Sequence, residues 1–135
     1  MWYLLWVFFL FVSYSVSAAE IVIADKATYQ VKVAETEEEL TRGLMFVKEM
    51  PRHEGMWFDL RSYSGVAMWM KNTYISLDML FIDCDYQIVD IKENCQPQSL
   101  DKIISKKPFC YVLELNGGEV ANNHIVIGDY LQGPK

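Results

Sequence analysis

The sequence is poor in positive charge and in histidine, and these shortages exclude several kinds of protein. The 12 Lys and Arg residues are outnumbered by 18 Asp and Glu residues, which gives a formal net charge of -6 at pH 7. Because proteins bind nucleic acids mainly through Lys and Arg that neutralise phosphates, we expect no nucleic-acid partner. The two histidines, His53 and His124, accompany no nucleophile motif of the Gly-x-Ser-x-Gly type, so no common hydrolase site is indicated.

The three cysteines contain no Cys-x-x-Cys pair, so neither a thioredoxin-like redox motif nor a zinc knuckle is indicated. An odd number of cysteines in an exported chain leaves at least one thiol unpaired or joined to another molecule. Three intramolecular pairings of Cys84, Cys95 and Cys110 are open. We expect a disulfide between Cys95 and Cys110, which would close the loop that contains Pro97 and Pro108 and contribute roughly 3 kcal/mol to stability.

The N-terminal segment predicts export. Residues 2–12 form an uninterrupted apolar run, and the small residues that follow suit signal peptidase, with cleavage expected after Ala18 or Ala19. The run is shorter than the roughly 20 residues of a membrane-spanning helix, and an uncleaved anchor is the alternative. We therefore expect a signal peptide over 1–19, a single domain over 20–135, and a periplasmic or secreted location. A membrane would be contacted only through the signal segment, if it stays uncleaved.

The remaining chain predicts a mainly β (β-rich α+β) domain. At 135 residues, the chain is long enough for one domain and too short for two ordinary ones. One short helix is expected after Thr36, whose hydroxyl can cap it while Glu39 returns the bond, and another within 119–124. Alternation of apolar and polar residues predicts strands at 21–24, 29–33, 56–58, 68–70, 77–82, 87–91 and 111–115, with 126–131 closing the domain. Many short strands and only two short helices favour a compact sandwich or a partly closed barrel.

The segment 67–83 is the most informative part of the sequence. It places two strand-like apolar runs around three consecutive polar residues, Lys71, Asn72 and Thr73. Asp78 lies inside the second apolar run, and Glu114 lies in the middle of a later predicted strand. A purely structural core would not need these side chains, so they are either turn residues or parts of a site.

Several motifs in a fixed order resemble one known family. They are Arg-Gly-Leu-Met at 42–45, Glu-Gly-Met at 54–56 with Phe58, Met-Trp-Met-Lys-Asn-Thr at 68–73, Leu-Asp-Met-Leu-Phe-Ile-Asp at 77–83, Glu-Asn at 93–94 with Pro97, Tyr-Val-Leu-Glu-Leu at 111–115, and Gly-Asp at 128–129. The set resembles the family known as domain of unknown function 192, from about Tyr29 to Leu131. The resemblance implies a small, often exported, β-rich sandwich-like domain without an established biochemical role. Ser76 stands where the family usually has proline, and Tyr86 where glycine commonly completes a hairpin turn.

The first functional hypothesis is a ligand pocket built from polar residues and one tryptophan. Its candidate residues are Arg42, Trp69, Lys71, Asn72, Thr73, Asp78 and Glu114. Because an unpaired buried carboxylate is costly, Asp78 and Glu114 need partners, and Arg42 and Lys71 are the natural ones.

These residues either form internal ion pairs and turn caps or bind a small anionic or saccharide-like ligand stacked on Trp69 or Trp57. A solvent-open cavity beside Lys71 and Asp78 would favour a site, and closed pairs at bonding distance would favour a structural role.

Two other classes of function are alternatives. Met68 and Met70 could place two thioethers on one side of a strand and bind Cu(I), although methionine is also an ordinary core filler. Asp78 and Glu114 could form a carboxylate pair for a hydrolase. We expect a small-ligand-binding or envelope accessory protein rather than an enzyme. Its partner would be an unknown small ligand or an envelope protein, with no cofactor.

Overall fold

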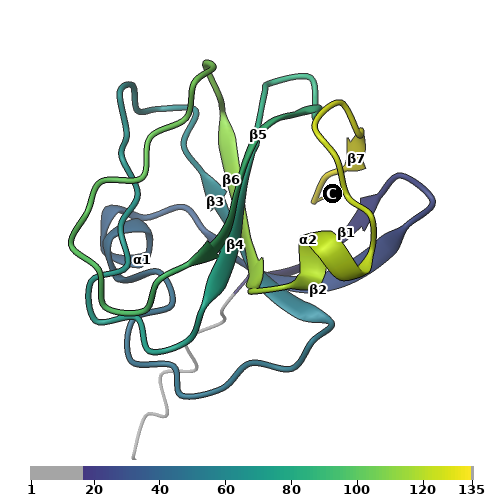
Figure 1. The fold of residues 1–135 in the computed structure, drawn as a ribbon. Helices are drawn as coiled ribbons and strands as arrows, with labels where there is room; N and C mark the ends of the chain where they lie inside the picture. Colours follow the sequence, from purple (N-terminus) through teal and green to yellow (C-terminus); the bar gives the residue numbers. More distant parts are fainter. Residues whose placement is uncertain (1–16, 135) are drawn as a thin grey trace, which may run out of the picture.

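The computed structural model describes residues 17–134 (Figure 1), so the expected signal peptide lies almost entirely outside the described residues. The elements are β1 (Ala18–Ile23), β2 (Ala27–Ala34), α1 (Glu37–Arg42), β3 (Glu54–Asp59), β4 (Leu77–Ile82), β5 (Ile88–Cys95), β6 (Tyr111–Asn116), α2 (Glu119–Asn122) and β7 (Leu131–Gln132). Within these residues, neither helix has the length and apolar character needed to cross a bilayer.

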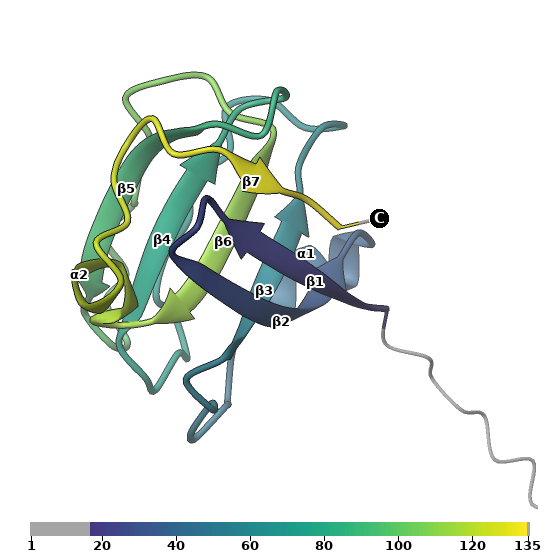
Figure 2. The same ribbon diagram turned by 90° about the vertical axis from the view of Figure 1, so that its right-hand side faces the viewer.

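The strands form one seven-stranded sheet in the order β5-β4-β6-β3-β2-β1-β7. Among the described strands, only the β2–β3 pair is parallel, and the other neighbours are antiparallel. The sheet curls so that β1 and β2 stand across from β4 and β5 (Figures 1 and 2). Near β7, Leu131 donates its amide hydrogen to the carbonyl of Tyr86, and Ile88 donates to Asp129. These bonds link the two ends of the sheet, so the predicted mainly β fold is confirmed as a partly closed barrel.

The sheet is buried on both faces because its central strands carry apolar residues at nearly every position. In β4 all six residues are buried; Leu80 and Ile82 point into the curl, and Met79 and Phe81 point away from it. The inner core comprises Ile21, Ile23, Tyr29, Val31, Val33, Trp57, Leu80, Ile82, Ile88, Tyr111, Leu113, Leu115, Val120, Ile125 and Leu131. The outer core comprises Ala34, Leu44, Met56, Phe58, Leu60, Met70, Leu77, Met79, Phe81, Cys95 and Val112.

Different elements cover the two cores. Helix α2 and the C-terminal segment lie on the concave side of the sheet, and α1 lies on the opposite side with several long loops (Figure 1). The predicted start of α1 is confirmed, because the amide of Glu39 donates to the Thr36 hydroxyl at 3.2 Å and that hydroxyl donates to the Glu39 carboxylate at 2.8 Å. The helix ends at Gly43, whose φ of 48° lies in the left-handed region that favours glycine.

The predicted strand over 68–70 is wrong. Met68 forms only an isolated bridge with Ile103, and the chain then turns, with the amide of Thr73 donating to the Met70 carbonyl at 3.1 Å. Local alternation of polar and apolar residues resembles a strand here, but in the part of the chain that the structure describes no strand continues the pairing beyond Met68. The predicted hairpin of 77–82 with 87–91 is confirmed, and Tyr86 takes a φ of 64° in its turn.

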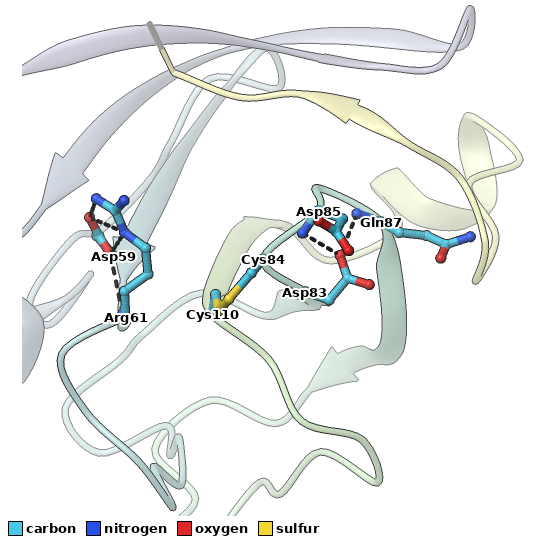
Figure 3. The surroundings of a disulfide bond; sticks show 7 residues. All are labelled: Asp59, Arg61, Asp83, Cys84, Asp85, Gln87 and Cys110. Carbon is cyan, nitrogen blue, oxygen red and sulfur yellow. Dashed lines mark hydrogen bonds and ion pairs between the residues drawn. A yellow bond between two sulfur atoms is a disulfide. The ribbon is translucent and has the colours of Figure 1, made fainter.

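The predicted disulfide between Cys95 and Cys110 is also wrong. Cys110 is bonded to Cys84, with 5.2 Å between their Cα atoms (Figure 3). Cys84 lies in the β4–β5 turn, and the amide of Cys110 donates to Ile82 at the same end of β4. Cys95 pairs with Leu77 at the other end of β4, because the hairpin carries β5 back along the whole strand. Sequence spacing favoured the shorter loop, but strand pairing selects the longer one.

Candidate functional site

A cavity of about 380 Å³ opens on the outer-core side of the sheet, between α1 and the loops that follow β3. Its apolar wall includes Leu40, Leu44, Phe58, Leu60 and Met68. Five of the seven candidate ligand-binding residues also line it: Arg42, Trp69, Lys71, Thr73 and Glu114. Residues that are up to 72 positions apart in sequence therefore meet in one hollow, which is large enough for a small organic ligand.

Glu114 lies within the cavity wall at the middle of β6, and its side chain is 4% exposed. In the sheet it is paired with Met56 on β3 and with Met79 on β4, so two buried methionines flank it on the same face. No ion pair within the described residues reaches its carboxyl group. Burial alone raises the pKa of Glu114 to about 8. The carboxyl group is therefore mainly protonated at neutral pH and can donate a hydrogen bond.

The exposed residues that line the cavity include the cations Arg42 and Lys71, the acid Glu37 and the ring of Trp69. Arg42 is exposed at the end of α1. The Lys71 ammonium lies 5.1 Å from the centre of the Trp69 ring, in a cation–π contact, and the Trp69 side chain is 44% exposed. Thr73 is buried below them, and its hydroxyl donates to the Lys71 carbonyl at 3.1 Å. The expected ion pairs of Arg42 and Lys71 with the buried carboxylates are not formed among residues 17–134.

Asp78 does not belong to this cavity. One of its carboxylate oxygens accepts from the amide of Asn94 at 2.8 Å. The other accepts from Gly118 at 3.1 Å and from Val120 at 2.9 Å, at the start of α2. Because both carboxylate oxygens of Asp78 already accept hydrogen bonds from backbone amides, we interpret Asp78 as a structural residue. It holds α2 and a bulged part of β5 against β4.

Asp78 and Glu114 cannot act as a catalytic pair on one substrate. Asp78 is paired with Leu115, one residue beyond Glu114, so the two side chains point to opposite faces of the sheet. Glycoside hydrolysis needs two carboxyl groups on either side of one bond in one site. Asp78 and Glu114 therefore do not provide the carboxyl pair that the hydrolase alternative requires.

Asn72 is a turn residue and is not among the residues that line the cavity. Its φ of 53° lies in the left-handed region that asparagine tolerates better than most residues. Its carbonyl accepts from the amide of Phe46, which ties this turn to the loop after α1.

The two methionines and the second tryptophan that the sequence suggested as metal or ligand contacts lie in different parts of the structure. Met70 is fully buried in the outer core, as expected of a core filler, whereas Met68 lines the cavity. Trp57, the second tryptophan proposed for stacking, is buried in the inner core on the opposite face of the sheet. Within residues 17–134, no cluster of three or more His, Cys, Asp or Glu side chains has a metal-binding arrangement.

Tyr63 was missed in the sequence. It lies in the loop after β3, lines the cavity and is 45% exposed at its rim. Its sequence neighbours, Ser62 and Ser64, are ordinary loop residues, so no periodicity or motif singles it out. Its position follows only from the course of the loop.

The fold and cavity define a small β-rich domain with a solvent-open pocket beside a buried carboxyl group. The family model for domain of unknown function 192, described as an uncharacterized ACR, matches residues 20–133. The chain belongs to this uncharacterised family, as its motifs indicated.

Two solved structures are similar over most of the chain. A proposed transcription regulator from Sinorhizobium meliloti 1021 has a TM-score of 0.84 and 38% sequence identity, with 88% of this chain and 95% of that chain covered. A protein of unknown function from Novosphingobium aromaticivorans DSM 12444 has a TM-score of 0.82 and 29% identity, with 86% and 85% covered. No curated protein matches the chain.

Proposed function

We propose that this protein is an exported small-ligand-binding module, and that its ligand is a small organic anion with a ring or sugar-like body. The observation that carries the proposal is the placement of Glu114 in the wall of a cavity whose mouth holds Arg42 and Lys71. The carboxyl group of Glu114 is buried and forms no ion pair with any residue of 17–134. A core that served only stability would not retain a buried acid beside a solvent-open hollow.

The chemistry of the lining supports this ligand class. Arg42 offers a planar set of donors and Lys71 a compact positive charge, and both suit a carboxylate. Trp69 offers an exposed ring face for stacking. Protonated Glu114 can donate a hydrogen bond to a neutral oxygen of the ligand, while the apolar wall excludes water from its body.

The disulfide between Cys84 and Cys110 supports the proposed location. Disulfides persist in oxidising compartments and are rare in the cytosol. Together with the apolar N-terminal run, this bond favours a periplasmic or secreted protein, either free or as an accessory to an envelope protein.

The Sinorhizobium protein is described as a transcription regulator, and because such proteins commonly bind DNA, DNA binding is another candidate function. The formal net charge of -6 opposes it here, because the dense phosphates of a nucleic acid repel a protein that is acidic overall. We therefore prefer a small anion as the ligand of the cavity.

Fluorescence titration of the mature domain tests the proposal directly, with benzoate and glucuronate as probes. Trp69 is exposed at the cavity mouth, whereas Trp57 is 1% exposed on the other face, so a change in emission that disappears in Trp69→Phe reports binding at the cavity. Removing either cation by Arg42→Ala or Lys71→Ala should weaken binding about tenfold, equivalent to about 1.4 kcal/mol. Lys32→Ala, which removes an exposed lysine on β2, is the matched control and should bind as the unmodified protein does.

Native mass spectrometry of the protein purified from its own envelope complements the titration, because it can reveal an endogenous ligand of another structure. If no bound mass is retained and neither probe changes the Trp69 emission, the proposed function is wrong.

A further inference from the structure

The segment 100–107, here called the lysine loop, gathers positive charge in a chain that is acidic overall. It contains Lys102, Lys106 and Lys107 and a single acidic residue, Asp101. The neighbouring acid Asp90 is 6% exposed, lies 3.5 Å from the Lys92 ammonium, and accepts a hydrogen bond from the amide of Lys106 at 2.8 Å. The negative charge of Asp90 is therefore offset locally, and the lysine loop presents a positive surface.

The backbone of the loop fixes which side chains face solvent. Ile103 exchanges both backbone hydrogen bonds with Met68, at 2.9 and 2.8 Å, and its side chain packs against the outer core. Because side chains alternate along an extended segment, Lys102 and Ile104 point outward. Leu100 and Ile104 are 66% and 60% exposed, so two large apolar side chains stand on the surface among the lysines.

A second hollow of about 540 Å³ adjoins the loop, between it and the segment that follows β3. All three lysines line it, with Ile104 and Tyr63, and no acidic side chain of the described residues does. Tyr63 also lines the first cavity, so the two hollows lie side by side along one face.

We propose that this face docks on a membrane surface that contains anionic phospholipid, with lipid phosphates against the lysine loop and with Leu100 and Ile104 in the acyl boundary. Lysines attract anionic headgroups, exposed apolar side chains gain by entering the boundary, and tyrosine is favoured at the level of the headgroups. Charge complementarity selects this partner over a zwitterionic surface.

The mixture of side chains favours a lipid over a nucleic acid. Two exposed aliphatic residues would lie against a phosphate backbone without a partner, and the loop contains no arginine, the residue most used for base recognition. The docking surface does not depend on the ligand of the first cavity, and it places the mouth of that cavity beside the bilayer.

Vesicle co-sedimentation of residues 17–135 tests the proposal without the apolar N-terminal run, and this form keeps β1 whole. Phosphatidylcholine vesicles with about 30% phosphatidylglycerol should bind the protein, and pure phosphatidylcholine vesicles should not. Replacing Lys106→Gln and Lys107→Gln together should weaken binding about 25-fold, at about fivefold per lysine. Lys32→Gln with Lys48→Gln is the matched control, since it makes the same change in net charge at exposed sites outside the loop.

The apolar part of the proposal has its own variant. Ile104→Ser preserves charge and should reduce vesicle binding severalfold, with little effect on folding because the side chain is exposed. Equal binding to both kinds of vesicle, or equal losses in the loop and control variants, would overturn the proposal. It would also be overturned if millimolar inorganic phosphate displaced the protein completely, which would indicate a soluble anion, or if duplex DNA bound more tightly than the vesicles. Each of these results leaves the titration of the first cavity unaffected.

Discussion

Asp78 and Glu114 lie on the paired strands β4 and β6, one register position apart, yet their carboxyl groups face opposite sides of the sheet. Asp78 accepts hydrogen bonds from three backbone amides and holds α2 in place. Glu114 lines a cavity and has no ion pair among residues 17–134. Two acids that look alike in the sequence should therefore respond differently to mutation and to pH.

Removal of the Asp78 carboxylate should destabilise the fold strongly. Asp78→Ala leaves the amides of Asn94, Gly118 and Val120 without their acceptor, and we expect a loss of about 3–5 kcal/mol in the free energy of unfolding. Asp78→Asn retains one acceptor oxygen and should lose less. Urea-induced unfolding measures both variants. A loss below about 1 kcal/mol in Asp78→Ala would show that these bonds contribute little.

Glu114 should make the protein less stable as the pH rises. Burial raises its pKa from 4.5 to about 8 in the folded protein. Between these values the folded protein holds a proton that the unfolded chain has lost, so the free energy of unfolding falls with rising pH. This stabilising contribution is fully present below about pH 4.5 and lost by about pH 8, with a slope of up to about 1.4 kcal/mol per pH unit.

Glu114→Gln is the matched variant, because glutamine has nearly the same shape and does not titrate. Urea unfolding across this pH range measures the difference in unfolding free energy between the two proteins. This difference should change by up to about 1.4 kcal/mol per pH unit. Asp59, Asp90 and Asp129 have pKa values lowered from 3.8, so they titrate below the range and do not obscure it. A difference that does not change with pH would mean that Glu114 is ionised in the folded protein.

Glycine in place of Asn72 should leave the stability of the fold nearly unchanged, whereas a β-branched residue should lower it. Its φ of 53° is free of strain for glycine and costs about 1–2 kcal/mol for most other residues. We expect Asn72→Gly to change the free energy of unfolding by less than about 0.5 kcal/mol and Asn72→Val to lower it by about 1–2 kcal/mol. Because Asn72 is outside the cavity lining, the glycine variant should also bind the probes normally. Weaker probe binding by a stable glycine variant would show that Asn72 contributes to the site.

The disulfide should contribute to stability while the third cysteine stays protected. Replacing Cys84 and Cys110 with serine removes a cross-link between residues 26 positions apart, and we expect a loss of roughly 3 kcal/mol. Cys95 is buried, and burial raises the pKa of its thiol to about 11, so alkylation should reach it only after unfolding. Non-reducing peptide mapping by mass spectrometry identifies the pair, and a Cys95–Cys110 peptide would contradict the structure.

Local signals in the sequence determined the elements whose geometry depends on near neighbours. The alternation in 77–82 and 111–115 and the polar turn between 83 and 87 predicted β4, β6 and the β4–β5 hairpin. Thr36 and Glu39 predicted the start of α1. At 68–70, the same alternation predicted a strand, but the chain forms an isolated bridge at Met68 and then turns. A strand needs a partner along its length, and among residues 17–134 this segment has a bridge only at Met68.

The candidate site was predicted in part. Five of the predicted side chains line one cavity: Arg42, Trp69, Lys71, Thr73 and Glu114. Asn72 and Asp78 do not line it, and Tyr63 lines it although nothing in the sequence singled it out. Polar residues in apolar surroundings can be recognised from the sequence alone, because buried charge is rare. The segments that pack against its face of the sheet decide whether the side chain of such a residue lines a cavity or accepts hydrogen bonds from backbone amides.

The sequence by itself determined the family, the mainly β class and the identity of two unusual acids, because family motifs, side-chain alternation and unusual polarity can all be read along the chain. Tertiary structure alone decided that Cys84 is the partner of Cys110, that Asp78 and Glu114 face opposite ways, and that a cavity forms beside Glu114. These outcomes depend on strand order and register, and those are set by packing between segments that are distant in the sequence.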